Sequence, residues 1–475
     1  MPHQPPPPRR PRVFRDPVHG DITFARGPFQ RLLEAVIDTE LFQRLRGIRQ
    51  TAVMNLVFHG AEHSRFAHSM GAAHVAGLMV ESAARNSGLE ISAATREETV
   101  LAALLHDVGH GPFSHSLEEI IGPAFAHERM TVRILTAPES EIHALLVAHD
   151  PGLPERLRAY IEHAPPSLAT TATAAATAPT GEGPRHWTHA IVSSQLDADR
   201  LDYLARDALM AGIRTHTFDL WRLVRSLVVI DNHLVVDARA QDIVEAFLLA
   251  LDQMYGTAYY HKTVRAASLL LEATIRRALD LARDGAGTGA GARERLFPPQ
   301  AGGPDPLYAL LTEGDGVSLA DFMRLDEAYV MSMFGLWREA PDPTLRELVS
   351  AHKTRRFPKM VRLPIETATL AAADWENAVA TATAIFRARF PDRDPRYHVH
   401  FDEPQRLSYK RYAPGAGTEP IRVTGPDGTA RPIESDPRSI ANNLSTRLYV
   451  PRLFVPGEIR AEVERALGMR RPASS

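Results

Sequence analysis

Four side chains that lie far apart in the sequence, His68, His106, Asp107 and Asp199, are of the types that ligate divalent metals. If they share one ion, the segments that carry them must meet in space, and this requirement constrains the fold more than any other feature. Imidazole and carboxylate ligands together suit Mn, Fe, Co, Ni or Zn, and Mg is also left open. Mixed nitrogen and oxygen ligation with open positions favours catalysis over a structural role.

The pair His106-Asp107 ends an apolar helix that we expect over residues 97–106. Successive side chains on a helix diverge by about 100°, so both can reach an ion that lies beyond the helix end. A metal beside further titratable groups is suited to the hydrolysis of a phosphate ester, because the ion polarises the phosphate and generates hydroxide near neutral pH. The groups that follow the pair are His110, His115 and Glu118.

Asp199, Tyr203 and Asp207 recur every four residues on a helix that we expect over residues 193–211, so they share one face. Two carboxylates and a phenol are unusual in a core but ordinary on a solvated surface. Because the chain has 21 histidines, a single His-Asp pair is also close to chance. The metal-site interpretation therefore requires the Asp199 helix to meet the other ligands.

Helical periodicity dominates the chain and predicts a mostly α fold. Small β elements are expected at a hairpin over residues 223–237 and near residues 421–428 and 447–450. The expected architecture is a helical core with small β-hairpins and a smaller α+β C-terminal part. The expected helices cover residues 29–50, the segment that begins at Ser64, residues 97–106 and 193–211, and residues 241–283 with a bend at Gly256.

Three segments are expected to lie outside the packed core. Residues 1–12 form a basic, proline-rich leader that lacks the apolar run of a signal peptide. Residues 165–186 and 284–306 are low in complexity or rich in glycine and proline, which predicts mobile loops. The domains expected are a core over residues 13–307 and a C-terminal region over residues 308–475.

Composition excludes several classes of protein. The chain has no cysteine, which rules out disulfides and thiolate zinc sites. It has no apolar run of about 18 residues, so no membrane span is expected. The formal net charge of −3 argues against a chain-wide basic surface for nucleic acid, although it leaves a local patch open. We expect a cytoplasmic protein.

Taken together, these segments resemble the HD-domain superfamily and, within it, the dNTP triphosphohydrolases, which include bacterial enzymes and the vertebrate sterile-alpha-motif-and-HD-domain enzyme. The resemblance begins at Arg15-Asp16-Pro17-Val18-His19-Gly20 and covers about residues 12–283. It weakens to Arg355-Arg356-Phe357-Pro358-Lys359. Within that span it includes residues 42–50, 64–69, 106–115, 199–207 and 259–262.

The resemblance implies hydrolysis of a dNTP to a deoxynucleoside and triphosphate by a metal held on His68, His106, Asp107 and Asp199. It implies that His115 is the catalytic histidine and that His110, His127 and Glu118 support it. Implied substrate contacts are Arg65 and Arg200 on the triphosphate, Gln50, Tyr203 and Asp207 on the deoxyribose, and Tyr259, which would leave no room for a 2′-hydroxyl.

The resemblance also implies an activating GTP or dGTP between subunits of a homo-oligomer, a tetramer by analogy. A carboxylate suits the N1–H and N2–H edge of guanine, and arginine suits O6 and N7. Gln43 and Arg46 would also be ordinary on any exposed helix. The implied regulatory residues are Val13, Arg15, Asp38, Gln43, Arg46, Arg355 and Lys359.

Two other kinds of function are open from sequence alone. Another HD phosphohydrolase, such as a 5′-nucleotidase or a cyclic-nucleotide phosphodiesterase, would share the four metal ligands. It would not be expected to need the set Arg65, Gln50, Tyr203, Asp207 and Tyr259. A nucleotide-sensing or single-strand nucleic-acid-binding protein that has lost catalysis would show a damaged ligand set or a large basic patch.

Overall fold

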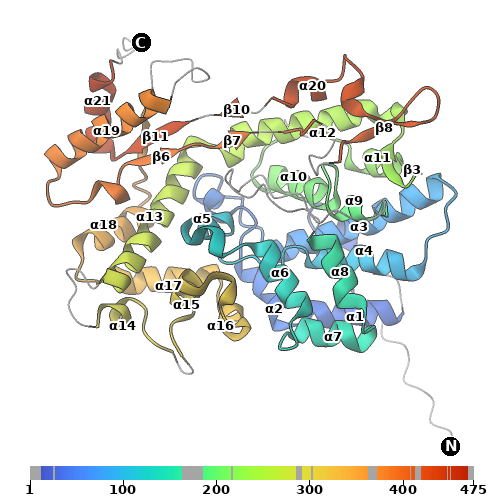
Figure 1. The fold of residues 1–475 in the computed structure, drawn as a ribbon, viewed down its shortest axis with the longest axis horizontal. Helices are drawn as coiled ribbons and strands as arrows, with labels where there is room; N and C mark the ends of the chain where they lie inside the picture. The colour runs from blue at the N-terminus through green and yellow to red at the C-terminus, as the bar shows by residue number, and fades with distance from the viewer. Residues whose placement is uncertain are drawn as a thin grey trace, which may run out of the picture.

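The computed structural model describes residues 12–24, 27–162, 186–214, 218–284, 291–300, 303–361, 372–406, 408–411, 419–446, 448–449 and 451–468. Within these residues the chain is mostly helical with small sheets, which confirms the predicted fold class (Figure 1). None of the described helices combines the length and the apolar character that a membrane crossing requires.

The helices of the first half surround the segments that carry the predicted ligands. They are α1 (Pro28–Ile37), α2 (Glu40–Gln43), α3 (Arg65–Asn86), α4 (Ala93–Leu105), α5 (His115–Ile121), α6 (His127–Thr136), α7 (Glu141–His149), α8 (Leu153–Ile161), α9 (His189–Val192), α10 (Ala198–Met210) and α11 (Leu220–Arg225).

The second half continues with long helices and then a mixed region. Its helices are α12 (Gln241–Met254), α13 (Lys262–Asp284), α14 (Ala292–Leu296), α15 (Pro306–Glu313), α16 (Leu319–Met323), α17 (Glu327–Trp337), α18 (Pro343–Lys353), α19 (Ala372–Arg389), α20 (Ala441–Leu444) and α21 (Gly457–Ala466).

The strands form four small sheets among the described residues. In spatial order these are β1 (Phe14–Asp16) with β2 (Gly20–Ile22); β10 (Leu448–Tyr449) with β7 (Gln405–Arg406); β5 (Lys359–Val361), β11 (Arg452–Val455) and β6 (His400–Asp402); and β3 (Leu227–Ile230), β4 (His233–Val236), β8 (Arg422–Thr424) and β9 (Ala430–Pro432). The hairpin predicted over residues 223–237 is confirmed as β3–β4, with Leu227 opposite Val236.

Helix α3 packs against both α4 and α10 and so links the predicted ligands. The Ser64 hydroxyl accepts a hydrogen bond from the Ala67 N–H at 3.3 Å and caps the helix where the sequence predicted its start. At Gly71 a Cβ atom would collide with the side chains of Asp202 and Arg206 on α10. Glycine therefore permits the close approach of α3 and α10.

Capping side chains correct three of the predicted helix boundaries. The expected helix over residues 29–50 is interrupted, because Thr39 follows α1 and caps α2 by accepting a hydrogen bond from the Phe42 N–H. Asp197 caps α10 in the same way, so that helix begins at Ala198 and not at residue 193. Ser92 caps α4, which begins at Ala93, four residues before the expected start.

The helix expected over residues 241–283 is interrupted at Gly256, where the bend was predicted. Helix α12 ends at Met254, Tyr255–Tyr259 form a π-helical turn, and α13 begins at Lys262. A π-turn inside a helical stretch is rare and is frequent at functional sites.

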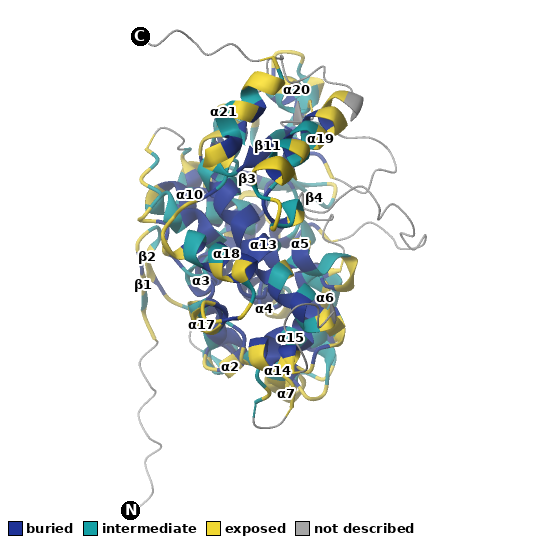
Figure 2. Cartoon of the chain, turned by 90° about the vertical axis from the view of Figure 1, so that its left-hand side faces the viewer, coloured by how far each residue is buried: buried dark blue, intermediate teal, exposed yellow. Residues whose placement is uncertain are grey.

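One hydrophobic core extends from Ile22 to Phe454, so it crosses residue 308 without a break. Figure 2 shows buried residues through α3, α4 and α13 in the interior. A second, small core lies between β5, β11, α19 and α21, where Phe386 and Leu453 are fully buried. Together with β6, which pairs with β11, and the segment that joins α19 to β6, these elements lie at one corner of the molecule (Figure 1). We call this group, residues 359–361, 372–402 and 452–466, the C-terminal unit.

Two of the segments expected outside the core fall largely beyond the described residues. Of the leader only Arg12 is described, and of residues 165–186 only His186. Within residues 284–306 the loop prediction is wrong in part, because α14 forms there. Ala292 and Leu296 of this helix are buried, and Leu296 belongs to the main core.

Candidate metal centre and hydrolytic site

The structure brings the four predicted ligands together from three helices. His68 comes from α3, His106 caps the C-terminus of α4 with Asp107 beside it, and Asp199 lies in the first turn of α10. Nε2 of His68 lies 3.0 Å from Oδ1 of Asp199, and Nε2 of His106 lies 3.5 Å from the same oxygen. Asp107 reaches Nε2 of His106 at 3.4 Å and Nε2 of His68 at 3.7 Å.

The remaining nitrogen of each imidazole is engaged by the protein. Nδ1 of His68 lies 2.8 Å from a carboxylate oxygen of Asp202, and Nδ1 of His106 lies 2.8 Å from the carbonyl oxygen of Ala103. Such partners fix the ring and raise the basicity of the nitrogen that faces a metal. Both Nε2 atoms therefore point at the same space.

Asp202 is itself held by a buried ion-pair network. It accepts hydrogen bonds from Arg206 at 2.9 Å and contacts His19 at 2.5 Å, and Arg206 donates to Asp16 at 2.8 Å. This network links β1 to α10 and keeps His68 in place.

The charge of the cluster also fits a cation. Burial alone would lower the pKa of His68, but hydrogen bonds to Asp199 and Asp202 raise it to about 10. The space between the carboxylates thus attracts positive charge, and a divalent ion would take the place of protons there. His68, His106 and Asp199 lie close enough together to share a divalent metal, whereas Asp107 adjoins them and also groups with His110 and His127.

A row of titratable groups adjoins this cluster. Nδ1 of His115 lies 3.3 Å from Glu118, whose other oxygen lies 2.7 Å from Nδ1 of His127. The rings of His110 and His127 stack with centroids 3.7 Å apart. Burial would raise the pKa of Glu118, but hydrogen bonds with His115 and His127 hold it well below its usual value. Glu118 is therefore an anion that orients two histidines.

His115 follows a strained turn. Phe113 and Ser114 both have positive φ, 57° and 51°, which side chains other than glycine rarely adopt. Such strain persists where the surrounding structure enforces it and is found at active sites. Here the Ser114 hydroxyl accepts hydrogen bonds from Arg65 at 2.9 and 2.7 Å. His115, 43% exposed, begins α5 directly after this turn.

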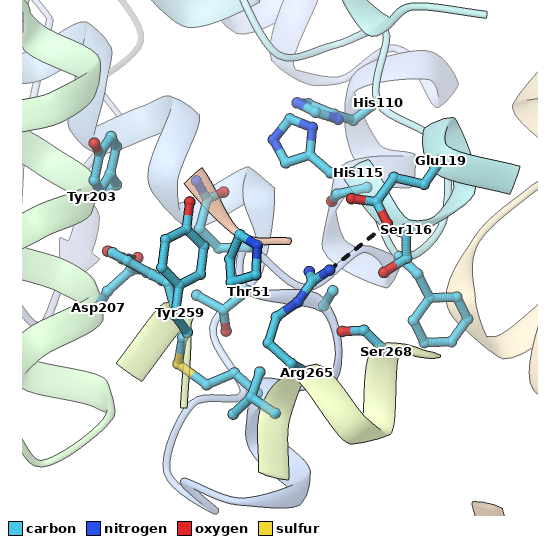
Figure 3. A pocket seen from close by; sticks show the side chains of 18 of the residues that line it. Thr51, His110, His115, Ser116, Glu119, Tyr203, Asp207, Tyr259, Arg265 and Ser268 are labelled. Carbon is cyan, nitrogen blue, oxygen red and sulfur yellow. Dashed lines mark hydrogen bonds and ion pairs between the residues drawn. The ribbon is translucent and has the colours of Figure 1, made fainter. Parts of the chain in front are cut away.

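A cavity of about 440 Å³ opens onto this row (Figure 3). Arg65 lines it and is buried, with its guanidinium paired to Asp107 as well as to Ser114. Most other predicted residues also line it; these are Gln50, Asp107, His110, His115, His127, Asp199, Tyr203, Asp207 and Tyr259.

The predicted deoxyribose residues form one side of the cavity. Asp207 accepts a hydrogen bond from the Tyr259 hydroxyl at 2.7 Å, and its other oxygen lies 2.7 Å from Nε2 of His63. The rings of Tyr203 and Tyr259 meet edge to face at 6.4 Å. Oε1 of Gln50 is buried and has no hydrogen-bond partner among the described residues, so it is available to a ligand.

The contact of Arg200 with the triphosphate stays a prediction. Arg200 is absent from the residues that line the cavity, and its guanidinium lies 3.6 Å from Asp197, the cap of its own helix. Arg65 is thus the better-placed arginine for a phosphate in this conformation.

Sequence reasoning missed several residues of the site. Asp202 and His63 hold predicted residues from behind, and Tyr255, Glu119 and Arg265 line the cavity. Only Asp202 carried a signal, because it lies three residues after Asp199 on the same helix. The others are brought in by contacts between distant segments.

The predicted regulatory residues fall into two groups. In the first, Asp38 pairs with Arg12 at 2.7 Å and Arg46 donates to Gln43 at 2.8 Å, whereas Arg15 pairs with Asp21 at 2.5 Å. In the second, Arg355 donates to the Leu56 carbonyl at 2.6 Å. Lys359 lines a separate cavity of about 350 Å³ together with Lys262 and Arg460. Val13 is exposed.

Comparisons with known proteins agree with this site. Residues 65–207 match the HD domain, and residues 218–288 match the HD associated region. An uncharacterised Bacillus subtilis protein, YwfO, is 29% identical over 451 residues, which are 94% of this chain and 93% of that protein. The zebrafish deoxynucleoside triphosphate triphosphohydrolase SAMHD1 is 33% identical over 230 residues, which are 45% of this chain and 36% of the relative.

Among solved structures, a phosphohydrolase from Bacteroides thetaiotaomicron has a TM-score of 0.73 and 26% identity, and the match covers 94% of this chain and 100% of that one. The likeness to SAMHD1 thus spans little more than a third of the zebrafish protein, whereas the likeness to the bacterial proteins spans almost the whole chain.

Proposed function

We propose that this chain, in which residues 65–207 are an HD domain and residues 218–288 an HD-associated region, is a metal-dependent phosphohydrolase that acts on deoxynucleoside triphosphates. The observation that carries the proposal is the meeting of three features at one cavity. These are the His/Asp cluster, the His115–Glu118 pair and the Tyr259–Asp207 pair. The partial likeness to SAMHD1 supports the choice of substrate.

The reaction is attack of water on the α-phosphorus with cleavage of the bond to the 5′-oxygen, which gives a deoxynucleoside and triphosphate. It requires neutralised charge, a positioned water and a proton for the departing oxygen. A divalent ion held by His68, His106, Asp107 and Asp199 would supply a Lewis acid and lower the pKa of bound water. Arg65 adds positive charge beside the phosphates.

His115 is the group that we assign to the departing oxygen. It lines the cavity, and Glu118 orients its ring through Nδ1, so Nε2 is the nitrogen that would deliver the proton. His127 shares Glu118 and stacks on His110, which completes a connected acid–base row. This assignment follows the usual arrangement in which a carboxylate orients a histidine that transfers a proton.

Selection for deoxyribose would come from the opposite side of the cavity. The Tyr259 ring is fixed by its hydrogen bond to Asp207, which His63 holds in turn. A fixed ring against the sugar would exclude a 2′-hydroxyl. Gln50, with a buried acceptor not used within the described residues, would receive the 3′-hydroxyl.

The decisive experiment is to incubate the purified, metal-loaded protein with each dNTP and with the matching NTP and to identify the phosphate product. Triphosphate from dNTPs alone supports the proposal. Orthophosphate, or turnover confined to deoxynucleoside monophosphates or cyclic nucleotides, would assign the chain to another HD phosphohydrolase. Salt-sensitive binding of single strands without any turnover would favour a nucleic-acid-binding role.

We also propose regulation by GTP or dGTP in a homo-oligomer. Its support is the carboxylate of Asp38 beside Arg12, together with the cavity where Lys262, Lys359 and Arg460 converge. Three cations around one cavity suit a polyphosphate. The two groups would join into one site across a subunit interface.

A further inference from the structure

The cavity has a third side that the proposed reaction does not use. Glu119, Arg265 and Ser268 line it, and Figure 3 shows Glu119 and Arg265 directed at each other, away from Tyr203 and Asp207. We call these residues the Glu119–Arg265 corner. Glu119 lies on α5 one turn after His115, so both side chains occupy the same helix face.

The charge of the corner is unsuited to phosphate. Arg265 donates hydrogen bonds to Asp402 from Nη2 at 2.6 Å and from Nε at 3.2 Å, and Asp402 is buried on β6. The guanidinium of Arg265 also lies 4.0 Å from the carboxylate of Glu119, whose side chain is 40% exposed. One arginine thus faces two carboxylates, and an added triphosphate would be repelled.

A third carboxyl group backs the corner. Glu272 of α13 is buried, and burial followed by the nearby charge of Glu119 raises its pKa well above the usual value. The neutral form of Glu272 is therefore favoured, and Glu119 is the carboxylate that lines the cavity. The corner therefore presents to the cavity one carboxylate acceptor, Glu119, beside one guanidinium donor, Arg265.

This donor–acceptor pair matches the edge of a nucleobase. Guanine places two donors, N1–H and N2–H, next to one acceptor, O6; two parallel bonds to a carboxylate are favourable. Adenine and cytosine offer one amino donor beside a ring acceptor, and thymine offers one imino donor between acceptors. Among the four bases, guanine alone fills both oxygens of a carboxylate and leaves an acceptor for arginine.

We propose that Glu119 and Arg265 read the nucleobase of the substrate and favour guanine. This rests on the proposed function, which places the sugar at Tyr259 and Asp207 and the α-phosphate near His115. The base then extends toward the remaining side of the cavity. Glu119 accepts from N1–H and N2–H, and Arg265, held by Asp402, donates to O6.

The test measures kcat/KM for dGTP, dATP, dCTP and dTTP with the metal-loaded protein, in a fixed concentration of GTP so that any activation is equal. We expect wild type to favour dGTP by about tenfold or more. In Glu119→Gln, which offers one acceptor and one donor, that preference falls to within about threefold. Glu155→Gln, which removes an exposed carboxylate of α8 outside the cavity lining, keeps it.

Arg265→Lys serves as the second variant, because it retains a cation for Asp402 but not the planar fork; the dGTP preference falls there as well. Equal hydrolysis of all four dNTPs by wild type, or an equal loss for all four in Glu119→Gln, overturns the inference and leaves the dNTPase proposal intact. If no dNTP yields triphosphate, the proposed function fails. Equilibrium binding of the four dNTPs to wild type and Glu119→Gln then decides the inference separately.

Discussion

At the scale of single residues, Asp202 shows how the site depends on a side chain that never faces the cavity. It is fully buried and contacts His68, His19 and Arg206. Its role is to orient His68 and not to touch substrate, so removal should act through the metal.

For Asp202→Asn we expect metal affinity to fall about 10- to 100-fold, because the partner of a ligating histidine supports its orientation and basicity. Titration of the apoprotein with Mn²⁺ or Zn²⁺ by calorimetry gives the measurement, with circular dichroism as the check on folding. Unchanged affinity in a folded variant would show that His68 does not ligate.

His115→Ala should behave in the opposite way. Turnover should fall about 10²- to 10⁴-fold, because the departing oxygen loses its proton donor, while the metal content stays at the wild-type level. Elemental analysis beside a rate measurement separates the two. A loss of metal together with activity would move His115 from acid to ligand.

At the scale of elements, the position of Asp199 is set by how closely α10 approaches α3. That approach is possible because Gly71 has no side chain to collide with Asp202 and Arg206. Gly77 lies on the same helix, but a Cβ there would meet only Val100, at an ordinary 3.5 Å.

Gly71→Ala should therefore displace α10 and separate Asp199 from His68 and His106. We expect weaker metal binding and a loss of stability on the order of 1–3 kcal/mol from the overpacked contact. Gly77→Ala is the matched control, and it should be neutral or stabilising, because alanine is the better helix former by about 1 kcal/mol. Denaturant unfolding and metal titration of both variants give the comparison, and equal behaviour of the two would contradict it.

Helix periodicity predicted where helices lie, but not where they stop. Thr39 caps the start of α2 and Asp197 caps the start of α10. Both residues also fit the helical pattern on either side of them, so periodicity alone did not show these boundaries. The chemistry of His and Asp suggested the metal cluster, although a single His-Asp pair is close to chance among 21 histidines. The packing of α10 against α3, which brings Asp199 to His68, is seen only in the structure.

At the scale of the whole molecule, the C-terminal unit had no function that the sequence could suggest apart from the regulatory role of Lys359. Its Asp402 holds Arg265 at the cavity, and Arg452 of β11 donates to the carbonyl of Tyr260. Asp402 and Arg265 are separated by 137 residues, and no local pattern encodes such a pairing. The Glu119–Arg265 corner was therefore not predictable from the sequence.

The same unit should make the protein sensitive to mild acid. Burial lowers the pKa of His398 and of His400 to about 4. The unfolded chain takes up these protons near pH 6.5, whereas the folded chain stays neutral down to about pH 4. Stability from these residues is thus complete above pH 6.5 and is lost as the pH falls from 6.5 to 4.

We expect the free energy of unfolding to drop by roughly 2 kcal/mol per histidine between pH 7 and 4.5, in addition to other titrations. His398→Phe, which keeps a ring against Phe386, should lose less over that range. Urea unfolding at both pH values tests this, and an equal loss in both proteins would contradict the assignment.

Regulation also belongs to the whole molecule. GTP or dGTP should raise the dNTPase rate and the molecular mass of the wild-type protein in solution. Asp38→Ala should abolish both effects, but its rate without nucleotide activator should equal that of wild type. Rates and light scattering with and without nucleotide provide the readout. If both proteins show the same rate and mass in every condition, the regulatory proposal fails.

The π-helical turn at Tyr255–Tyr259 fixes how many residues join α12 to α13, as well as the direction in which α13 leaves it. Such a turn amounts to one residue more than an α-helix would use, and a residue corresponds to about 100° of rotation. Deleting Gly256 would swing α13 relative to α12 and remove Arg265 from the cavity along with Tyr259. Any protein that binds the same substrate with this fold should therefore keep the number of residues between Asp207 and Arg265, even where its sequence differs widely.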